Sequence, residues 1–321
     1  LRFQMSERCY ICGKKNKTSS ESYHANCLKK LFNSTKIPIF NYSQEDLNEL
    51  AKKIITNRIS VPGVQPKLSL HLEQGNKSNS RLTLVGLEGN YILKPQTPDW
   101  PFMPESEHFA MLFARLCNID TAEFGLIPLK DEKLAYITKR MDRTKTGLIH
   151  MEDFCQLTNK QTNQKYQGSM EQIAKGIVKF SDNFGLDLIR FFQITVFCFL
   201  IGNSDMHLKN FSLIHRNKNF WELSPAYDLV PVKLVMPADK EELALSLCGK
   251  KSNFTFNHFK KFAFNIGLSD IQFKKNYSAI LKLAINKLDE ALSRSFLPEE
   301  MQESFKNEFL ERYNRIIPTN C

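Results

Sequence analysis

Two different hydrophobic periodicities divide the chain, and this division restricts the folds that it can adopt. In the first half, apolar and polar residues alternate over 67–73 and 81–88, with a polar loop between them, which indicates a β-hairpin. In the second half, five long stretches have helical spacing and one further hairpin interrupts them. The helical stretches are 169–181, 186–201, 256–266, 270–293 and 298–316, and the hairpin strands are 210–215 and 219–223. A sheet-rich half followed by a mainly helical half predicts an α+β chain with two lobes.

Composition supports a folded protein of enzyme size. The 321 residues are 42% hydrophobic, which is enough for a sizeable core and excludes wholesale disorder. The formal net charge of +10 favours acidic partners such as nucleic acid, although a lysine-rich surface explains it equally well. Most of the eight cysteines stand alone in apolar segments, which is typical of reduced thiols in the cytoplasm.

Neither a signal peptide nor a membrane span is expected. Residues 1–4 precede Met5 and resemble an expression remnant, so they are set aside. The longest apolar run, 186–202, contains Asp187 and Arg190 and is too short and too polar to cross a bilayer. We therefore expect a cytoplasmic protein that does not act at a membrane, while export into another cell stays open.

A polar loop, "NSDMHLKN" (203–210), follows one of the most apolar helical stretches. It contains Asp205 and, five residues later, Asn210. The hairpin after this loop returns the chain near its starting point, so that Asp228, eighteen residues on, can face the same site as Asn210. A carboxylate that orients the accepting hydroxyl, followed by two oxygen ligands for Mg²⁺, is the residue order of protein kinases. The order predicts phosphoryl transfer, although alone Asp205 could be a solvated helix-end carboxylate and Asp228 a turn former.

Two further side chains of the polar loop have open roles. His207 is expected to brace the loop as a structural histidine, because it has no acid or base partner nearby in the sequence. Lys209 either neutralises the phosphoryl group in transfer or is an ordinary solvated lysine.

The first half is expected to supply a cation for the phosphates. Lys94 ends a short strand over 91–95, and Glu107 lies on a helix predicted over 105–117, where it can pair with this lysine. Each residue also has a simpler interpretation, since lysines on strands and glutamates on helices are usually solvated. A lysine in the sheet-rich half together with carboxylates in the helical half, in this order, is much rarer by chance.

The phosphate-binding loop is expected within 59–70. Neither of the usual glycine-rich phosphate motifs occurs in the sequence. This segment instead places Ser60, Gly63, Gln65 and Lys67 just before the first strand. Its Pro and Gly residues favour a fixed turn whose backbone N–H groups can face an anion.

Six motifs resemble, in order, those of the HipA-like toxin serine/threonine protein kinases, over roughly residues 58 to 320. They are "SVPGVQPK", "YILKP", "ESEH", "KRMDR", "LIGNSDMHLKNFSL" and "PAYDLVP". The resemblance implies a two-lobe protein-kinase-like fold and the use of ATP and Mg²⁺. It implies a β-rich N-lobe over 58–143 and a mainly α-helical C-lobe over 144–321.

The same resemblance implies roles for the residues named above. Asp205 would be the catalytic base, and Asn210 and Asp228 would hold Mg²⁺. The residues implied to contact the nucleotide are Lys94, Ser60, Gly63, Gln65, Glu107, Lys139, Met141 and His207. Of these, Lys139 and Met141 belong to "KRMDR", the adenine-binding connector between the lobes.

Ser60 matches the serine that such kinases autophosphorylate in their phosphate loop. In the family this modification expels the loop and silences the enzyme. A phosphoserine adds about −1.5 to −2 charge, which opposes binding of a triphosphate.

The region before the phosphate loop differs from that of full-length members of the family. Residues 5–57 form a small Cys/His head and a linking helix, predicted over 43–57 with a cap at Ser43. This is similar to the short HipT-type members, in which a HipS-like small subunit is a separate protein. The resemblance implies a cognate antitoxin, DNA contact only through that antitoxin, and a protein substrate such as an aminoacyl-tRNA synthetase.

The N-terminal head contains two close pairs of soft ligands. Cys9 and Cys12 form C-x-x-C, and His24 and Cys27 form H-x-x-C after an eleven-residue gap. This pattern suits tetrahedral Zn²⁺, and metal would account for the folding of a module too small to have a core. Reduced cysteines with an incidental histidine are the main alternative, and a C-x-x-C redox site is a third.

Two other functions compete with a protein kinase. A small-molecule kinase uses the same order of base, Asn, hairpin and Asp, and only the loop containing Ser60 favours a protein substrate. A catalytically idle, zinc-headed module that binds nucleic acid would use the net charge of +10. The presence of Lys94, Asp205, Asn210 and Asp228 together argues against an idle protein.

Overall fold

The computed structural model describes seven ranges of the chain, and these fall into two compact units. The described residues are 7–18, 21–56, 66–74, 80–85, 89–144, 147–217 and 220–318. The sheet unit comprises Leu1–Phe109, Ala122–Met141 and Ser293–Leu297, and the helical unit comprises Ala110–Thr121, Asp142–Leu292 and Pro298–Cys321. Within the described ranges, no helix is both long enough and apolar enough to cross a bilayer.

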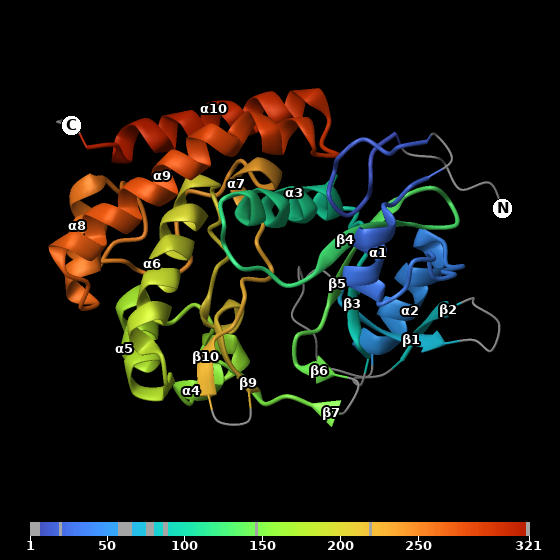
Figure 1. The fold of residues 1–321 in the computed structure, drawn as a ribbon, viewed down its shortest axis with the longest axis horizontal. Coiled ribbons are helices and arrows are strands. Elements are labelled where there is room, and N and C mark those ends of the chain that lie inside the picture. The colour runs from blue at the N-terminus through green and yellow to red at the C-terminus, as the bar shows by residue number, and fades with distance from the viewer. Residues whose placement is uncertain are drawn as a thin grey trace. The chain divides into compact units, whose positions relative to one another are not determined.

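A five-stranded antiparallel sheet forms the centre of the sheet unit, in the order β2-β1-β3-β5-β4 (Figure 1). Its strands are β1 (Leu68–Gln74), β2 (Ser80–Leu84), β3 (Tyr91–Lys94), β4 (Phe124–Pro128) and β5 (Leu134–Lys139). Alternation on β1 buries Leu68 and Leu70 and leaves His71 exposed, as the period of two requires. The register places Lys94, at the end of β3, opposite Tyr136 on the neighbouring strand.

Three helices contribute to the sheet unit. They are α1 (Ala25–Phe32), α2 (Gln44–Thr56) and the first turns of α3 (Met103–Leu116). The expected cap of α2 is present, since Ser43 N donates to Asp46 Oδ2 (2.8 Å) and Asp46 N donates to Ser43 Oγ (3.2 Å). The Tyr91 hydroxyl donates to the carbonyl of Leu31 (2.9 Å), which fastens α1 to β3.

The core of the helical unit is built around α6 (Phe184–Leu200). The other long helices of this unit are α5 (Met170–Phe180), α8 (Phe256–Asn265), α9 (Asp270–Ser293) and α10 (Glu299–Ile316). Phe191, Phe192 and Phe197 on α6 are fully buried. The ring of Phe197 packs edge-on against Phe113 of α3, with 5.3 Å between centroids.

A three-stranded sheet, in the order β10-β9-β8, completes the helical unit. Its strands are β8 (Met151–Asp153), β9 (Ser212–Asn217) and β10 (Phe220–Leu223). The shorter elements are β6 (Arg143–Thr144), β7 (Gly147–Leu148), α4 (Phe154–Leu157), α7 (Val232–Val235) and the 3₁₀ turns η1 (Thr162–Gln164) and η2 (Leu208–Asn210). The hairpin β9–β10 therefore joins the polar loop to the segment that carries Asp228.

The predicted α+β organisation is confirmed. All five stretches of helical spacing form helices whose ends lie within two residues of the expected ones. Strand β5 ends at Lys139 and β6 begins at Arg143, so residues 140–142 of the expected connector "KRMDR" (139–143) lie between two strands. Elements that were not predicted include α1, β4 and β8.

Candidate active site

A sharp turn at Gly202, two residues after the end of α6, leads into the polar loop. Its φ of +70° favours glycine, and an added Cβ would lie 3.2 Å from Lys233 Cβ and 3.3 Å from Arg312 Nη2. The turned chain buries Asn203 completely, and its Oδ1 accepts a hydrogen bond from the backbone N–H of Asp205 (3.1 Å). These contacts bring Asp205 to the surface, where its side chain is 51% exposed.

Two side chains orient the Asp205 carboxylate. The Tyr166 hydroxyl donates to Asp205 Oδ1 (2.5 Å), and Nε2 of His207 lies 4.0 Å from the same oxygen. The Tyr166 ring also packs edge-on against His207, with 5.0 Å between centroids. Burial and the bond to Asp205 raise the pKa of Tyr166, so the phenol stays a protonated donor at neutral pH. The result is an oriented, half-exposed carboxylate, which suits a group that takes a proton from a hydroxyl.

Asn210 lies at the end of η2 and is bonded back to the start of the loop. Its Nδ2 donates to the backbone carbonyl of Asp205 (3.0 Å), and only 4% of the residue is exposed. Because the amide nitrogen makes this bond, the ligand-capable atom of the side chain is Oδ1.

Asp228 follows the hairpin in an unusual backbone conformation. Its φ is +60°, a region that non-glycine residues adopt at a cost and that is frequent at functional sites. The preceding residue, Tyr227, donates its hydroxyl to the backbone carbonyl of Lys209 (2.8 Å). The neighbour of Asp228 is thereby bonded to the residue before Asn210.

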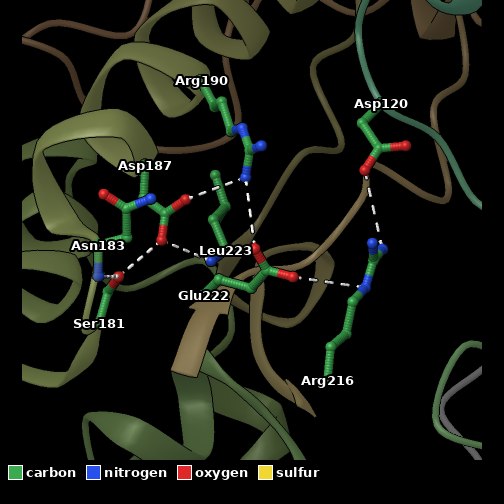
Figure 2. A network of polar contacts seen from close by, with 8 residues as sticks. All are labelled: Asp120, Ser181, Asn183, Asp187, Arg190, Arg216, Glu222 and Leu223. Carbon is green, nitrogen blue, oxygen red and sulfur yellow. Dashed lines mark hydrogen bonds and ion pairs between the residues drawn. The ribbon is translucent and has the colours of Figure 1, made fainter. Parts of the chain in front are cut away.

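A polar network pins the hairpin to the start of α6 (Figure 2). The fully buried Asp187 accepts hydrogen bonds from Leu223 N of β10 (2.7 Å) and from the Ser181 hydroxyl (2.6 Å). Glu222 lies between two arginines, 3.7 Å from Arg190 Nη1 and 3.6 Å from Arg216 Nε. The network therefore fixes the strand that leads to Asp228.

A backbone contact fixes the segment just after the hairpin. Ala226 N donates to Asp120 O (2.8 Å), and Thr121 and Ala226 form a parallel β-bridge. The Asp120 carboxylate also lies 3.7 Å from Arg216 Nη2 of β9. Figure 2 shows this ion pair. The segment before Asp228 is thus fixed at Leu223, where β10 ends, and at Ala226, two residues before Asp228.

Lys209 is paired rather than solvated. Its Nζ donates to Asp153 Oδ2 (2.7 Å), and the Lys209 side chain is 35% exposed. Asp153 also caps α4 by accepting from Gln156 N (3.0 Å). The interpretation of Lys209 as an ordinary solvated lysine is therefore wrong.

Lys94 and Glu107 form a buried ion pair within the sheet unit. Lys94 Nζ lies 2.6 Å from Oε1 and 2.8 Å from Oε2 of Glu107, and the two residues are 3% and 0% exposed. The ammonium also lies 5.5 Å from the centre of the Tyr136 ring. The interpretation of each residue as solvated is wrong, because both side chains are buried. Burying two charges costs free energy that the fold must offset elsewhere.

Five other residues were predicted to contact the nucleotide, and two of them, Lys139 and Met141, lie in described parts of the sheet unit. Ser60, Gly63 and Gln65 lie outside the described residues. Lys139 ends β5, and its Nζ donates to Asn33 Oδ1 (3.3 Å). Met141 is half-buried and is the last residue of its segment in the sheet unit.

The four predicted metal ligands of the head come together. One ligand atom from each of Cys9, Cys12, His24 and Cys27 lies within 4.8 Å of the others. His24 Nδ1 is 3.3 Å from Cys12 Sγ and 4.0 Å from Cys27 Sγ. Hydrogen bonds from Cys12 and Cys27 lower the pKa of the Cys9 thiol, so the cluster favours a thiolate.

Residues 59–292 match the family of the HipA-like C-terminal domain. The chain belongs to this family. This HipA-like chain is 29% identical over 270 residues to a Haemophilus influenzae protein named "Putative kinase", a match that covers 75% of this chain and 77% of that protein. It is also 34% identical over 185 residues to "Putative kinase Y4dM" of Sinorhizobium fredii, covering 54% of this chain and 45% of that protein.

Two solved structures share the fold of the HipA-like chain. A chain of the Shewanella oneidensis MR-1 toxin–antitoxin complex of HipA, HipB and operator DNA superimposes with a TM-score of 0.67 at 21% identity, over 83% of this chain and 70% of that one. The Helicobacter pylori proinflammatory kinase CtkA superimposes with a TM-score of 0.55 at 15% identity, over 77% and 93%. The predicted kinase-like α+β fold is therefore confirmed.

Sequence reasoning missed several residues that shape this site. Tyr166 and Asp153 contact the polar loop from 39 and 56 residues away, and Asn203 within the loop accepts from Asp205 N. No sequence pattern marks pairs at such distances. Tyr227 could have been found, because it directly precedes Asp228 in the motif "PAYDLVP".

Proposed function

We propose that this HipA-like chain is an ATP- and Mg²⁺-dependent kinase that phosphorylates serine or threonine in a protein. One observation carries the proposal. Asn210 is bonded to the backbone of Asp205, and Tyr227, the neighbour of Asp228, is bonded to Lys209, so the expected base and both cation ligands belong to one hydrogen-bonded unit. Membership of the HipA-like family adds independent support.

Asp205 is the proposed base. As the oxygen of the acceptor hydroxyl bonds to the γ-phosphorus of ATP, the Asp205 carboxylate takes the hydroxyl proton. The bond from the γ-phosphorus to the β–γ bridging oxygen breaks, and ADP leaves with that electron pair. The contacts of Tyr166 and His207 with the carboxylate support its orientation. His207 would lie beside the nucleotide.

Asn210 and Asp228 are the proposed magnesium ligands. They offer an amide oxygen and a carboxylate, which are the hard donors that Mg²⁺ prefers. When bound, the ion neutralises charge on the phosphates. Lys94 would grip the phosphates, and Glu107 would hold its ammonium in place, as the buried ion pair supports.

The rest of the nucleotide site is proposed from the family resemblance. Ser60, Gly63 and Gln65 would form the phosphate loop, with Ser60 as the autophosphorylated residue. Lys139 and Met141 would contact the adenine. Autophosphorylation at Ser60 would silence the kinase, because a phosphoserine competes with the charge of a triphosphate.

A toxin–antitoxin role is proposed for the same enzyme. The Shewanella HipA protein is found in a complex with HipB and operator DNA, which supports an antitoxin partner here. We propose that the chain resembles the HipT type, binds a separate HipS-like small subunit, meets DNA only through its antitoxin, and modifies a translation factor such as an aminoacyl-tRNA synthetase. The proposal places it in the cytoplasm.

Phosphorylation of the purified chain tests the proposal. With Mg²⁺ and labelled ATP, we expect label on Ser60, located by mass spectrometry of peptides. Asp205→Asn should lower turnover by at least about 10²-fold and leave the Kd for ATP nearly unchanged. Asp289→Asn, whose side chain is 80% exposed, is the matched control and should behave as wild type.

Three outcomes would decide against parts of this assignment. Absence of ATP binding by calorimetry would leave only the idle zinc-headed module that binds nucleic acid. ATP turnover without phosphoprotein would favour a small-molecule kinase. Near-normal turnover of Asp205→Asn would remove the base from this position.

A further inference from the structure

Hydrogen bonds of the backbone hold the four Cys/His residues of the head close together. Within the C-x-x-C turn, Gly13 N donates to Cys9 O (2.8 Å), and Cys9 N donates to Lys14 O (2.8 Å). His24 N donates to Cys9 Sγ (3.4 Å), which joins the second ligand pair to the first. Among the described residues, this is the group of His, Cys, Asp and Glu side chains with the spacing of a metal centre.

Zn²⁺ fits this donor set best. Three sulfurs and one imidazole are a structural zinc combination, and Zn–S bonds of about 2.3 Å place tetrahedral ligands about 3.8 Å apart. The ligand atoms already lie within 4.8 Å of one another, so only a small contraction is needed. Nε2 of His24 lies 3.0 Å from Lys15 O, a contact that leaves Nδ1, the nitrogen near the sulfurs, to face the metal.

The C-x-x-C turn is bonded to β4, an edge strand of the five-stranded sheet. Tyr10 O accepts from Leu126 N of β4 (2.8 Å), and the Tyr23 hydroxyl donates to Leu126 O (2.9 Å). Ile11, which lies between the two cysteines, is 2% exposed and packs over Gly125, where an added Cβ would come within 2.8 Å of Ile11 Cγ1. The head is therefore an extension of the β4 edge and not a separate appendage.

One contact leads from this turn to the buried ion pair. The Ile11 carbonyl lies 3.0 Å from Nε2 of His108, a fully buried residue of α3. His108 is the residue after Glu107, whose carboxylate faces Lys94. Its ring is also held edge-on by Phe124 and Phe296, at 5.4 and 5.5 Å. A helix transmits position between adjacent residues, so the place of the Ile11 carbonyl constrains where Glu107 lies.

We propose that Cys9, Cys12, His24 and Cys27 bind one structural Zn²⁺, and that the zinc-held Ile11 carbonyl positions His108 and, through α3, the Lys94–Glu107 pair. His108 is thus a positioning residue. The second half of this inference rests on the proposed function, because it predicts how well Lys94 receives ATP. The first half does not depend on it.

Metal analysis of the purified full-length chain tests the zinc site. We expect about one Zn²⁺ per chain, and after exchange with Co²⁺ the intense visible absorption of a tetrahedral thiolate site. Cys27→Ser should lose most of the metal, whereas Cys248→Ser, a half-buried cysteine outside the head, should keep it. Wild-type protein without stoichiometric zinc, or full metal content in Cys27→Ser, would overturn the site.

A His108→Phe variant tests the positioning role. Phe keeps an aromatic ring between Phe124 and Phe296 but removes the bond to Ile11. We expect zinc content to stay at wild-type level, the KM for ATP to rise at least about fivefold, and kcat to change less than about twofold. His150→Phe, at an exposed position, is the control and should leave both constants unchanged.

The outcomes separate this inference from the proposed function. If zinc-loaded wild-type protein binds no ATP, the kinase proposal fails and the zinc site stands on its metal analysis. If ATP binds equally well to wild type, His108→Phe and folded chelator-treated protein, the kinase proposal stands and the positioning role is wrong.

Discussion

The hydroxyl of Tyr227 donates a hydrogen bond to the backbone carbonyl of Lys209 (2.8 Å) and lies 2.5 Å from the hydroxyl of Ser212. One side chain therefore joins the polar loop, the first residue of β9 and the segment that carries Asp228. The two ends of the hairpin are therefore bonded to each other through this hydroxyl. Because Tyr227 precedes Asp228 and Lys209 precedes Asn210, this hydrogen bond joins the neighbours of the two expected metal ligands across the hairpin.

Tyr227→Phe should weaken this junction while leaving the ring in place. We expect the free energy of unfolding to fall by about 1 kcal/mol, the usual net value of one hydrogen bond. Kinase activity should fall about tenfold, because Asp228 loses a fixed neighbour. Urea denaturation and phosphorylation assays measure the two effects. Tyr42→Phe is the control, since its half-buried hydroxyl makes no hydrogen bond within the described residues, and an equal effect of both variants would contradict the prediction.

Glu107→Gln should be among the most destabilising single changes in the sheet unit. It removes the carboxylate that faces the buried Lys94 ammonium, and breaking such a pair costs about 3–5 kcal/mol. The double variant Lys94→Met, Glu107→Leu should recover much of the stability, because it buries no charge. Thermal unfolding and ATP calorimetry together test this. A double variant that is stable but still binds ATP as wild type would remove Lys94 from the nucleotide site.

Glu105 should make stability depend on pH. Burial raises the pKa of this carboxyl to about 7, and its Oε2 has no hydrogen-bond partner within the described residues. Between the ordinary glutamate pKa and 7, the folded state binds more protons than the unfolded state, so stability falls as pH rises through this window. Glu105→Gln should therefore add on the order of 1–2 kcal/mol at pH 8 and almost nothing at pH 4.

The pH effect is measured by urea denaturation at the two pH values. Glu300→Gln, on the exposed first turn of α10, is the control, and its stability changes at the two pH values should differ by less than about 1 kcal/mol. A Glu105→Gln variant that is stabilised equally at both pH values would show that charge is not the cause.

Asp187→Asn should loosen the hairpin. The fully buried carboxylate accepts from Leu223 N and Ser181 Oγ and lies 3.4 Å from Arg190 Nη1, as Figure 2 shows. Removing its charge should cost about 1–3 kcal/mol, since hydrogen bonds to a buried charge are stronger than neutral ones. By contrast, Lys306→Ala breaks the exposed pair with Asp289 and should cost less than about 1 kcal/mol. Similar losses in the two variants would show that the network does not stabilise the unit.

Periodicity predicted the elements that bury one face and expose the other. The β1–β2 hairpin and four of the five long helices have such faces, whereas α6 is buried throughout residues 194–200 and was predicted from its long apolar run. Strand β4 was not predicted, because its five residues, Phe124–Pro128, are all buried and the sequence therefore shows no alternation of apolar and polar residues there. Helix α1 was not predicted, because it has only eight residues and its N-cap residue, His24, makes no side-chain capping hydrogen bond.

Residue types and spacings along the chain were enough to propose Asp205, Asn210, Asp228, Lys94 and the four Cys/His residues of the head as candidate site residues. Only the tertiary structure shows which side chains contact and orient these residues. Tyr166 reaches Asp205, Asp153 reaches Lys209, and His108 reaches Ile11 from 39, 56 and 97 residues away. Such contacts arise from packing, which depends on the whole chain at once and leaves no periodic trace in any short segment.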